Sequence, residues 1–375
     1  MSTAISQHGK GVSSVSNPPK YLIVGSIEPC SGKTSSLLGL ARQLRQRGLE
    51  FAIGQPLVPA VSQSPSPELN EAEVNFVAQQ LQLSDDRVQA PVLTLSPDLL
   101  AKRLQGRDTT DYTQQVRDLP SPDVELVVWE GPTSLSEGRS FGLALPQLAE
   151  LVDAGVLLVI RYHSMLTIDR VLSAKAQLGD RPLGVILNNV PLEDLDEVHS
   201  RVQPFLEESG ITVVGVLPHS ALLRSVSVED VVKNLKAEVL CGKERLDLMI
   251  ESIQIGAMSV NSAVKYFQQS LNTAIVTGGD RTDIQLAALE TATHCLILTG
   301  HHLTPSDLVL NRAEEVEIPV ISVERDTLTT VEILDAMFGR TPVREPMKLD
   351  YIYQMAQEHL NVERLLQMLE LGNPD

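Results

Sequence analysis

Cysteine, tryptophan and long apolar runs are scarce in this sequence. Its 375 residues include three cysteines, one tryptophan and 3% aromatic residues. Because Cys30, Cys241 and Cys295 are odd in number and far apart, they match neither a disulfide framework nor a metal-ligand spacing. The sequence also lacks the run of about 18 apolar residues that a membrane span would need. These absences indicate a cytoplasmic protein with reduced thiols and no membrane segment.

Basic residues are also fewer than acidic ones. Lys and Arg number 30 against 48 Asp and Glu, which gives a formal net charge of -18. Such a surface repels phosphate backbones and therefore excludes nucleic acid as an expected partner. The length suits two domains, each able to bury a core. Residues 1–19 have no apolar signal-peptide core, and their Ser, Gly and Pro content predicts a flexible tail.

The most informative stretch is a candidate phosphate-binding loop. An apolar run at 21–24 is followed by a small-residue loop and then by a helical pattern. Backbone N–H groups at the start of such a helix cradle phosphates, the lysine reaches the outer phosphates, and the hydroxyl after it can ligate Mg²⁺. The predicted nucleotide-binding residues are Ser31, Gly32, Lys33, Thr34 and Ser35, with Thr34 also a metal ligand.

This loop departs from the strict spacing of a standard phosphate-binding loop. Ile27 stands where a standard loop has glycine, and Glu28 and Pro29 occupy positions that usually hold small, permissive residues. One alternative is therefore a degenerate loop that keeps the fold without binding nucleotide. We favour binding, because the lysine and the hydroxyl are both present.

Alternating apolar runs and helical patterns follow the loop. After an irregular Pro- and Ser-rich stretch at 56–73 and helical spacing over 98–117, an apolar run at 124–129 ends in Glu130. Helices and strands then alternate to residue 216, which predicts a mostly parallel sheet covered by helices on both faces. Ligands bind beyond the carboxyl ends of such strands, so Glu130 is predicted to lie beside the loop as a second Mg²⁺ ligand.

A later strand ends in Asn188 and Asn189. Amide side chains at the ligand edge of the sheet can read an adenine base. Asparagine also favours turns whatever the ligand, so the residues alone leave both interpretations open.

The alternation restarts near residue 246 and predicts a second, smaller α/β domain. Asp280 is predicted to cap a helix, and the two glycines before it can expose backbone N–H groups to an anion. A structural joint explains the same pattern, so both interpretations stay open. The candidate second ligand site consists of Gly278, Gly279, Asp280, Arg281 and Thr282.

Four segments together resemble a known family. GSIEPCSGKTS, WEG, GVILNN and TGGDRTDIQLAALET resemble proteins that join a dethiobiotin-synthetase-like P-loop domain to a DRTGG domain. The same pair is similar to the N-terminal, regulatory half of long-form bacterial phosphate acetyltransferases. The resemblance covers about residues 20–345. It implies a P-loop domain over 20–237 and a DRTGG domain over 238–345, before a helical segment at 346–375.

The resemblance also implies ligands and an activity. It makes Lys33 and Thr34 ligands of ATP and Mg²⁺, Glu130 a carboxylate beside the metal, and Asn188 the adenine contact. Dethiobiotin synthetase has Lys-Pro after its second strand, and the corresponding dipeptide here is Gln55-Pro56. A neutral amide cannot replace that positive charge, which argues against ligase chemistry.

Two hypotheses follow from these residues. The preferred one is a regulatory protein that binds ATP or a related nucleotide and whose DRTGG domain senses a small molecule or contacts a protein. The alternative is an ATP-dependent ligase or a slow ATPase. Acetyl transfer is not expected, because the sequence ends at Asp375, before the catalytic domain of the long form. A homo-oligomer is expected by analogy with related folds.

Overall fold

The computed structural model describes residues 18–59, 68–300, 305–339 and 345–371. Most of the predicted flexible tail lies outside these ranges. Contacts between residues divide the chain into two units. The first unit contains Met1–Pro218 and Ile352–Asp375, and the second contains His219–Tyr351. Of the helices in the described ranges, none has the length and apolar character that crossing a bilayer requires.

The first unit is built on a seven-stranded sheet in the order β4-β2-β6-β1-β7-β8-β9. All neighbouring strands in this sheet pair in parallel. The predicted parallel α/β fold of this part is confirmed. The strands are β1 Lys20–Gly25, β2 Phe51–Gly54, β4 Val88–Gln89, β6 Leu126–Glu130, β7 Gly155–Arg161, β8 Leu183–Val190 and β9 Thr212–Pro218.

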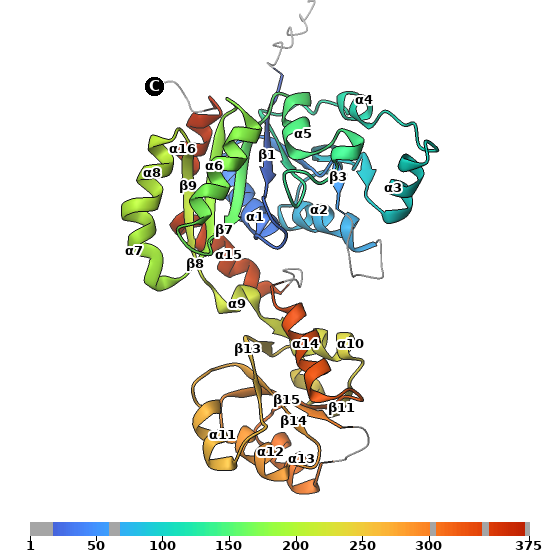
Figure 1. The fold of residues 1–375 in the computed structure, drawn as a ribbon, viewed down its shortest axis with the longest axis vertical. Helices are drawn as coiled ribbons and strands as arrows, with labels where there is room; N and C mark the ends of the chain where they lie inside the picture. The colour runs from blue at the N-terminus through green and yellow to red at the C-terminus, as the bar shows by residue number, and fades with distance from the viewer. Residues whose placement is uncertain (1–17, 60–67, 301–304, 340–344, 372–375) are drawn as a thin grey trace, which may run out of the picture. The chain divides into compact units, whose positions relative to one another are not determined.

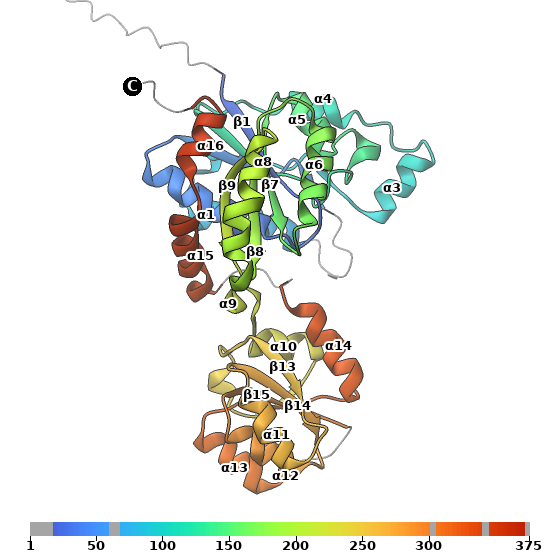
Figure 2. The ribbon, with the colours of Figure 1, turned by 60° about the vertical axis from the view of Figure 1, so that its left-hand side comes forward.

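Helices cover both faces of this sheet (Figures 1 and 2). One face packs against α5, α6 and α8, whose apolar residues share a cluster with those of the strands. The other face carries α1, α2 and α16, and α1 contacts each of the other two. Two-sided burial explains why the strands read as continuous apolar runs. The bounds are α1 Lys33–Gln46, α2 Glu68–Gln80, α5 Leu145–Leu151, α6 Thr167–Leu178, α8 Gln203–Glu208 and α16 Val362–Met368.

Two predicted elements of the first unit differ from the structure. The stretch at 56–73 is not wholly irregular, because β3 (Leu57–Val58) pairs with β5 (Leu93–Thr94) and α2 starts at Glu68. The helical pattern over 98–117 forms two helices, α3 (Pro97–Leu104) and α4 (Tyr112–Arg117). Gly106, with a φ of +68°, lies in the break between them.

Within the alternating pattern up to residue 216, the segment 192–208 has the apolar spacing of one helix, but the structure interrupts it. It starts as a 3₁₀ turn and α7 (Leu195–Glu197), passes through a π-helical turn at Val198–Val202, and ends as α8. Pro204 explains the wider turn, because proline has no N–H to donate and its ring crowds the carbonyl four residues earlier.

The second unit contains a five-stranded sheet in the order β11-β16-β15-β14-β13. Its strands pair in parallel except β11, which is antiparallel to β16. A separate antiparallel pair joins β10 to β12. The strands are β10 Val226–Ser227, β11 Glu238–Cys241, β12 Met249–Ile250, β13 Ser252–Ile255, β14 Thr273–Gly278, β15 Thr293–Thr299 and β16 Val320–Ser322.

Helices cover both faces of this second sheet as well (Figure 1). Apolar residues of α10 and α14 share one core cluster, and those of α11, α12 and α13 share another. The predicted smaller α/β unit is therefore present. The helices of the unit are α9 Ala221–Arg224, α10 Val228–Leu235, α11 Val260–Phe267, α12 Thr282–Leu289, α13 Asp307–Glu315 and α14 Thr327–Met337.

The division between the units lies at Pro218/His219, whereas the sequence places a domain boundary after residue 237. The difference arises because α10 packs its apolar face into the core of the second unit. The C-terminal segment begins with α15 (Pro346–His359), and α16 follows it. α16 contacts α1 and β9, so it belongs to the first unit.

Candidate functional site

The candidate loop connects β1 to α1 in the first unit. Gly32 caps the N-terminus of α1 with a φ of +92°, a left-handed conformation that glycine adopts without strain. A side chain there would also clash, because an added Cβ would meet Asn188 Nδ2 at 2.3 Å. The first N–H groups of α1 have no partner within the helix, which is the arrangement that binds phosphate.

Lys33 is held in the interior of the loop. Its side chain is 8% exposed, and Nζ donates a hydrogen bond of 3.1 Å to the carbonyl of Pro132. This carbonyl follows β6, the strand that pairs directly with β1. An ammonium group has three donors, and among the described residues this carbonyl is its one acceptor. The remaining donors suit phosphate oxygens.

Thr34 and Glu130 meet as the sequence predicts. The Thr34 hydroxyl donates to Glu130 Oε1 at 2.9 Å, and Glu130 is 3% exposed at the end of β6. Within the described residues, Glu130 Oε2 is buried without a hydrogen-bond partner, as is the hydroxyl of Ser31. An unpaired buried carboxylate oxygen is costly, and hard oxygen ligands of this kind suit Mg²⁺. These residues therefore fit a nucleotide with Mg²⁺.

Asn188 lies against the loop. Its Nδ2 donates to the carbonyl of Ser31 at 2.7 Å, and its Oδ1 accepts the N–H of Asn189 at 2.9 Å. Both residues lie within β8, where Asn189 has a φ of +62° and the pairing with β9 shifts register between Leu187 and Val190, so they form an irregularity of the strand and not a separate turn. The side chain of Asn188 thus supports the loop, and the adenine contact stays a prediction.

The structure brings the whole first set of predicted residues to one edge of the sheet. Ser35 lies in the first turn of α1, half-buried beside the residues described above. Gln55 is buried just after β2, where the resemblance implies a lysine. The stretch at 56–73 also contains three carboxylates that could serve as acidic ligands; they fall in α2, and their side chains lie outside the described part of the structure: Glu68, Glu71 and Glu73.

Sequence reasoning missed the partners of Glu28. This carboxylate binds His163 Nε2 at 3.1 Å and Arg170 Nη2 at 3.1 Å. Ser26 holds the turn before it, since its hydroxyl donates to the Glu28 carbonyl at 2.7 Å. The two cationic partners lie 135 and 142 residues along the chain, so no local pattern in the sequence could pair them with Glu28.

The second set of predicted residues lies in the second unit, at the end of β14. Gly279 N–H donates to the Thr299 carbonyl at 2.9 Å, and Gln285 Nε2 donates to the Gly278 carbonyl at 2.8 Å. Arg281 Nη2 donates to the Met258 carbonyl at 2.9 Å. These bonds hold the turn to its neighbouring segments, which is what a structural joint requires.

The prediction that Asp280 caps the helix is wrong. α12 starts at Thr282, and Arg281 is its N-cap without a side-chain cap bond. The chain turns first, because Arg281 N–H bonds the Gly278 carbonyl, and Asp280 is exposed. Arg281 also pairs with Asp283 at 3.1 Å, and its hydrogen bond lowers the pKa of that carboxyl. A ligand site here stays a prediction.

Comparison with known proteins matches both units. Residues 20–227 match the family described as an AAA domain, and residues 230–337 match the DRTGG domain. A phosphate acetyltransferase of Synechocystis is 22% identical over 370 residues, covering 93% of this chain and 52% of the relative. That of Haemophilus influenzae is 25% identical over 373 residues, covering 88% and 50%.

A solved structure is similar to part of the chain. It is the regulatory region of Clostridium perfringens pyrophosphatase, with CBS and DRTGG domains, at 20% identity and a TM-score of 0.28. The match covers 42% of this chain and 73% of that structure. The chain spans about half the length of the curated relatives it matches, consistent with the N-terminal half of the long form. The chain therefore belongs to the AAA domain family and carries a DRTGG domain after its P-loop domain.

Proposed function

We propose that this chain is a nucleotide-binding regulatory protein. In the proposal, the first unit binds ATP or a related nucleotide with Mg²⁺, and the DRTGG unit takes a second small ligand or a protein partner. The observation that carries the proposal is the hydrogen-bonded pair of Thr34 and Glu130. In the part of the chain that the structure describes, the Oε2 atom of Glu130 is buried without a partner at the end of β6, the strand that pairs with β1, from which the phosphate loop emerges. The proposal assigns no acetyltransferase activity to these two units.

Each residue of the site has a part in binding. The N–H groups at the start of α1 would receive the phosphates, and Lys33 would exchange the Pro132 carbonyl for phosphate oxygens. Thr34 and Glu130 would hold Mg²⁺, which neutralises phosphate charge when bound. Asn188 keeps the loop in register through Ser31.

A regulatory role is favoured over ligation by Gln55. This residue is 4% exposed after β2, the strand next to β6, and its amide carries no charge. A developing anion there would lack the cation that ligase chemistry requires. A slow ATPase remains the second candidate, because the Thr34–Glu130 pair that binds a metal also suits phosphoryl transfer.

Isothermal titration with ATP and Mg²⁺ tests the proposal. Wild type should bind, Lys33→Ala should not, and Lys20→Ala should bind as wild type, because Lys20 is an exposed lysine in a surface pair with Glu370. The same samples are assayed for ADP. Binding without ADP release supports a regulator, whereas ADP release that Glu130→Gln abolishes supports the ATPase. Absence of binding by folded wild type refutes nucleotide binding and leads to the degenerate-loop alternative.

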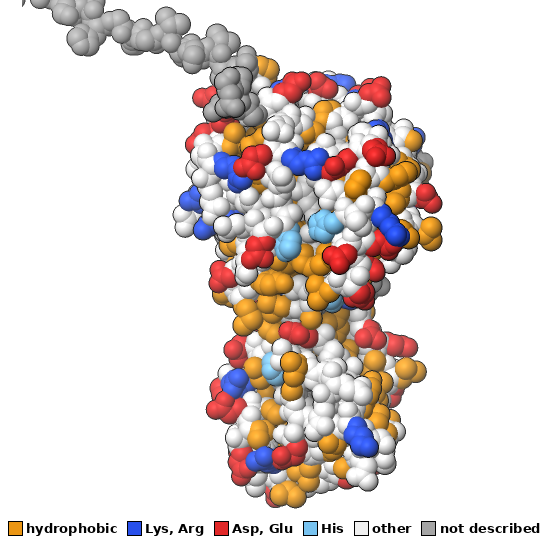
Figure 3. Space-filling model, turned by 90° about the vertical axis from the view of Figure 1, so that its left-hand side faces the viewer, with side chains coloured by type: hydrophobic (Ala, Val, Ile, Leu, Met, Phe, Trp, Pro, Cys, Tyr) orange, Lys and Arg blue, Asp and Glu red, His pale blue; other side chains and the backbone are white. Residues whose placement is uncertain are grey.

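Assembly and location belong to the same proposal. A homo-oligomer and a cytoplasmic location stay predictions. Acidic side chains are scattered over both units on the face that Figure 3 shows, and the net charge of -18 still argues against a nucleic-acid partner. Measurement of the molar mass by size exclusion with light scattering decides the assembly.

A further inference from the structure

In the first sheet, the direction in which successive strands are added reverses between the neighbouring strands β1 and β7. The segments that follow these two strands lie on either side of this point. From β1 the chain builds β2 and β6 on one side of that strand, and then crosses to place β7 on its other side. In open α/β sheets, ligands bind at such a reversal, beyond the carboxyl ends of the strands. The phosphate loop lies on one side of this point and α6 on the other.

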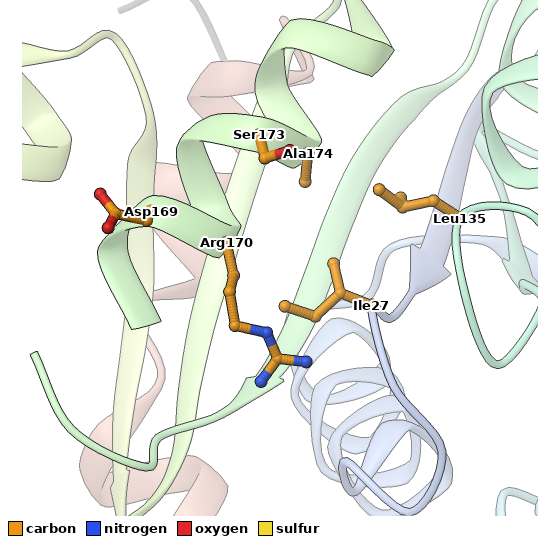
Figure 4. A pocket seen from close by; sticks show the side chains of 6 residues that line it. All are labelled: Ile27, Leu135, Asp169, Arg170, Ser173 and Ala174. Atoms are coloured by element: carbon orange, nitrogen blue, oxygen red, sulfur yellow. The ribbon is translucent and has the colours of Figure 1, made fainter. Parts of the chain in front are cut away.

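A surface cavity of about 320 Å³, wide open to solvent, lies beside this point, apart from the Thr34–Glu130 pair. Its walls come from the start of the phosphate loop, the segment after β6, and α6 (Figure 4). A space of this size admits a small ligand. The lining residues are Ile27, Leu135, Asp169, Arg170, Ser173 and Ala174.

The lining has an apolar part and a cationic edge. In Figure 4, Ile27, Leu135 and Ala174 surround the central space, and the carboxylate of Asp169 points away from it. The guanidinium of Arg170 lies at the edge beside Ile27. A ligand that fits this lining has a short alkyl chain and a negative head, and the planar fork of arginine matches a carboxylate.

In this structure, Arg170 forms an ion pair with the carboxylate of Glu28. Glu28 Oε2 lies 3.1 Å from Arg170 Nη2, and Glu28 Oε1 lies 3.1 Å from His163 Nε2. The side chains of Arg170 and His163 are 40% and 49% exposed, so an incoming anion can reach both. Glu28 therefore occupies the position that a ligand carboxylate would take on these cations.

We propose that this cavity binds a short aliphatic carboxylate, whose head displaces Glu28 from Arg170 and whose chain packs against Ile27 and Leu135. Displacement frees the side chain of Glu28, which lies in the phosphate loop four residues before Gly32. The ligand therefore changes the affinity of that loop for nucleotide. This coupling rests on the proposed function, whereas binding of the carboxylate does not.

Hexanoate is a suitable probe, and saturation-transfer NMR of the full chain without nucleotide measures its binding. Arg170→Ala should weaken binding by about tenfold or more, because a charge-assisted hydrogen bond is lost. Ser173→Leu should also weaken it by filling the cavity from an exposed helix position. Arg201→Ala is the matched control, because Arg201 is an exposed arginine paired with Glu197 elsewhere in the unit.

The variant that separates this proposal from nonspecific binding is Glu28→Gln. Removing the competing carboxylate should tighten hexanoate binding by about two- to fivefold, the range expected for a partly exposed ion pair. Weaker or unchanged binding would overturn the exchange. Equal binding by wild type and Arg170→Ala, or by hexanoate and hexanol, would overturn the site, as would no binding to folded wild type.

Coupling is then measured by titrating ATP and Mg²⁺ with and without saturating hexanoate. A change in nucleotide affinity that disappears in Glu28→Gln supports the coupling, and no change in wild type overturns it. If ATP fails to bind at all, the proposed function fails, but the hexanoate titrations still decide the cavity.

Discussion

Replacing Gly32 with alanine tests how the phosphate loop is held. Two effects add. The φ of +92° is a left-handed conformation that costs a residue with a Cβ about 1–2 kcal/mol. The new Cβ would also lie 2.3 Å from Asn188 Nδ2, so that side chain must move and lose its bond to Ser31, worth about 0.5–1.5 kcal/mol. We expect a total loss of about 1.5–3.5 kcal/mol.

Gly48→Ala supplies the matched control. Gly48 follows the C-terminus of α1 with a φ of +76°, and an added Cβ there has nothing within 4 Å. This variant should therefore show the backbone cost alone, about 1–2 kcal/mol. The difference between the two variants isolates the collision with Asn188.

Urea unfolding followed by tryptophan fluorescence measures both free energies. Trp129 is the sole tryptophan of the sequence, is 1% exposed in the first unit, and donates Nε1–H to Gln89 at 2.6 Å. In an Asn188→Ala background, Gly32→Ala should cost no more than Gly48→Ala. If Gly32→Ala costs the same with and without the asparagine side chain, the brace between Asn188 and the loop is refuted.

Three further changes give distinct readouts. Glu130→Gln should abolish the dependence of nucleotide affinity on Mg²⁺, measured by calorimetry, and an unchanged Mg²⁺ dependence would contradict the metal site. Ser227→Ala removes the cap bond to Asp230 N–H and should lower the unfolding free energy of the second unit by about 1 kcal/mol, followed by circular dichroism. Burial lowers the pKa of Lys348 below 10.5, so the unfolded state binds more protons between the two pKa values. The slope of stability against pH across that window should be more positive in wild type than in Lys348→Met, and parallel curves would exclude the effect.

The order of strands and helices follows from local patterns, and much of it can be predicted from the sequence. Buried parallel strands appear in the sequence as continuous apolar runs. The candidate phosphate-binding residues at 31–35 are adjacent in the sequence, so they can be recognised without knowledge of the fold. Glu130 joins them because carboxyl ends of parallel strands share an edge. These relations follow from local patterns together with the general rule for parallel sheets.

What could not be predicted depends on distant or competing contacts. Glu28 looked like an obstacle to anions, and its pairing with Arg170 depends on how α6 packs beside the loop. Aspartate is a residue type that often caps helices, which is why the sequence predicts a cap at Asp280. In the structure, Arg281 N–H bonds the Gly278 carbonyl in a turn, and α12 begins only after this turn. The apolar spacing over 192–208 is that of one helix. The π-helical turn before Pro204 arises because proline has no backbone N–H to donate.

The return of α16 to the first unit has a consequence for synthesis on the ribosome. α1, the helix that begins at the phosphate loop, contacts α16, and Gly39 within it lies against Ile352 and Ala356. These partners are translated only after the whole of the second unit, which ends at Tyr351. During that interval the apolar side of α1 lacks its cover, so nascent chains are open to chaperones and cannot complete the nucleotide-binding unit until translation has passed residue 368.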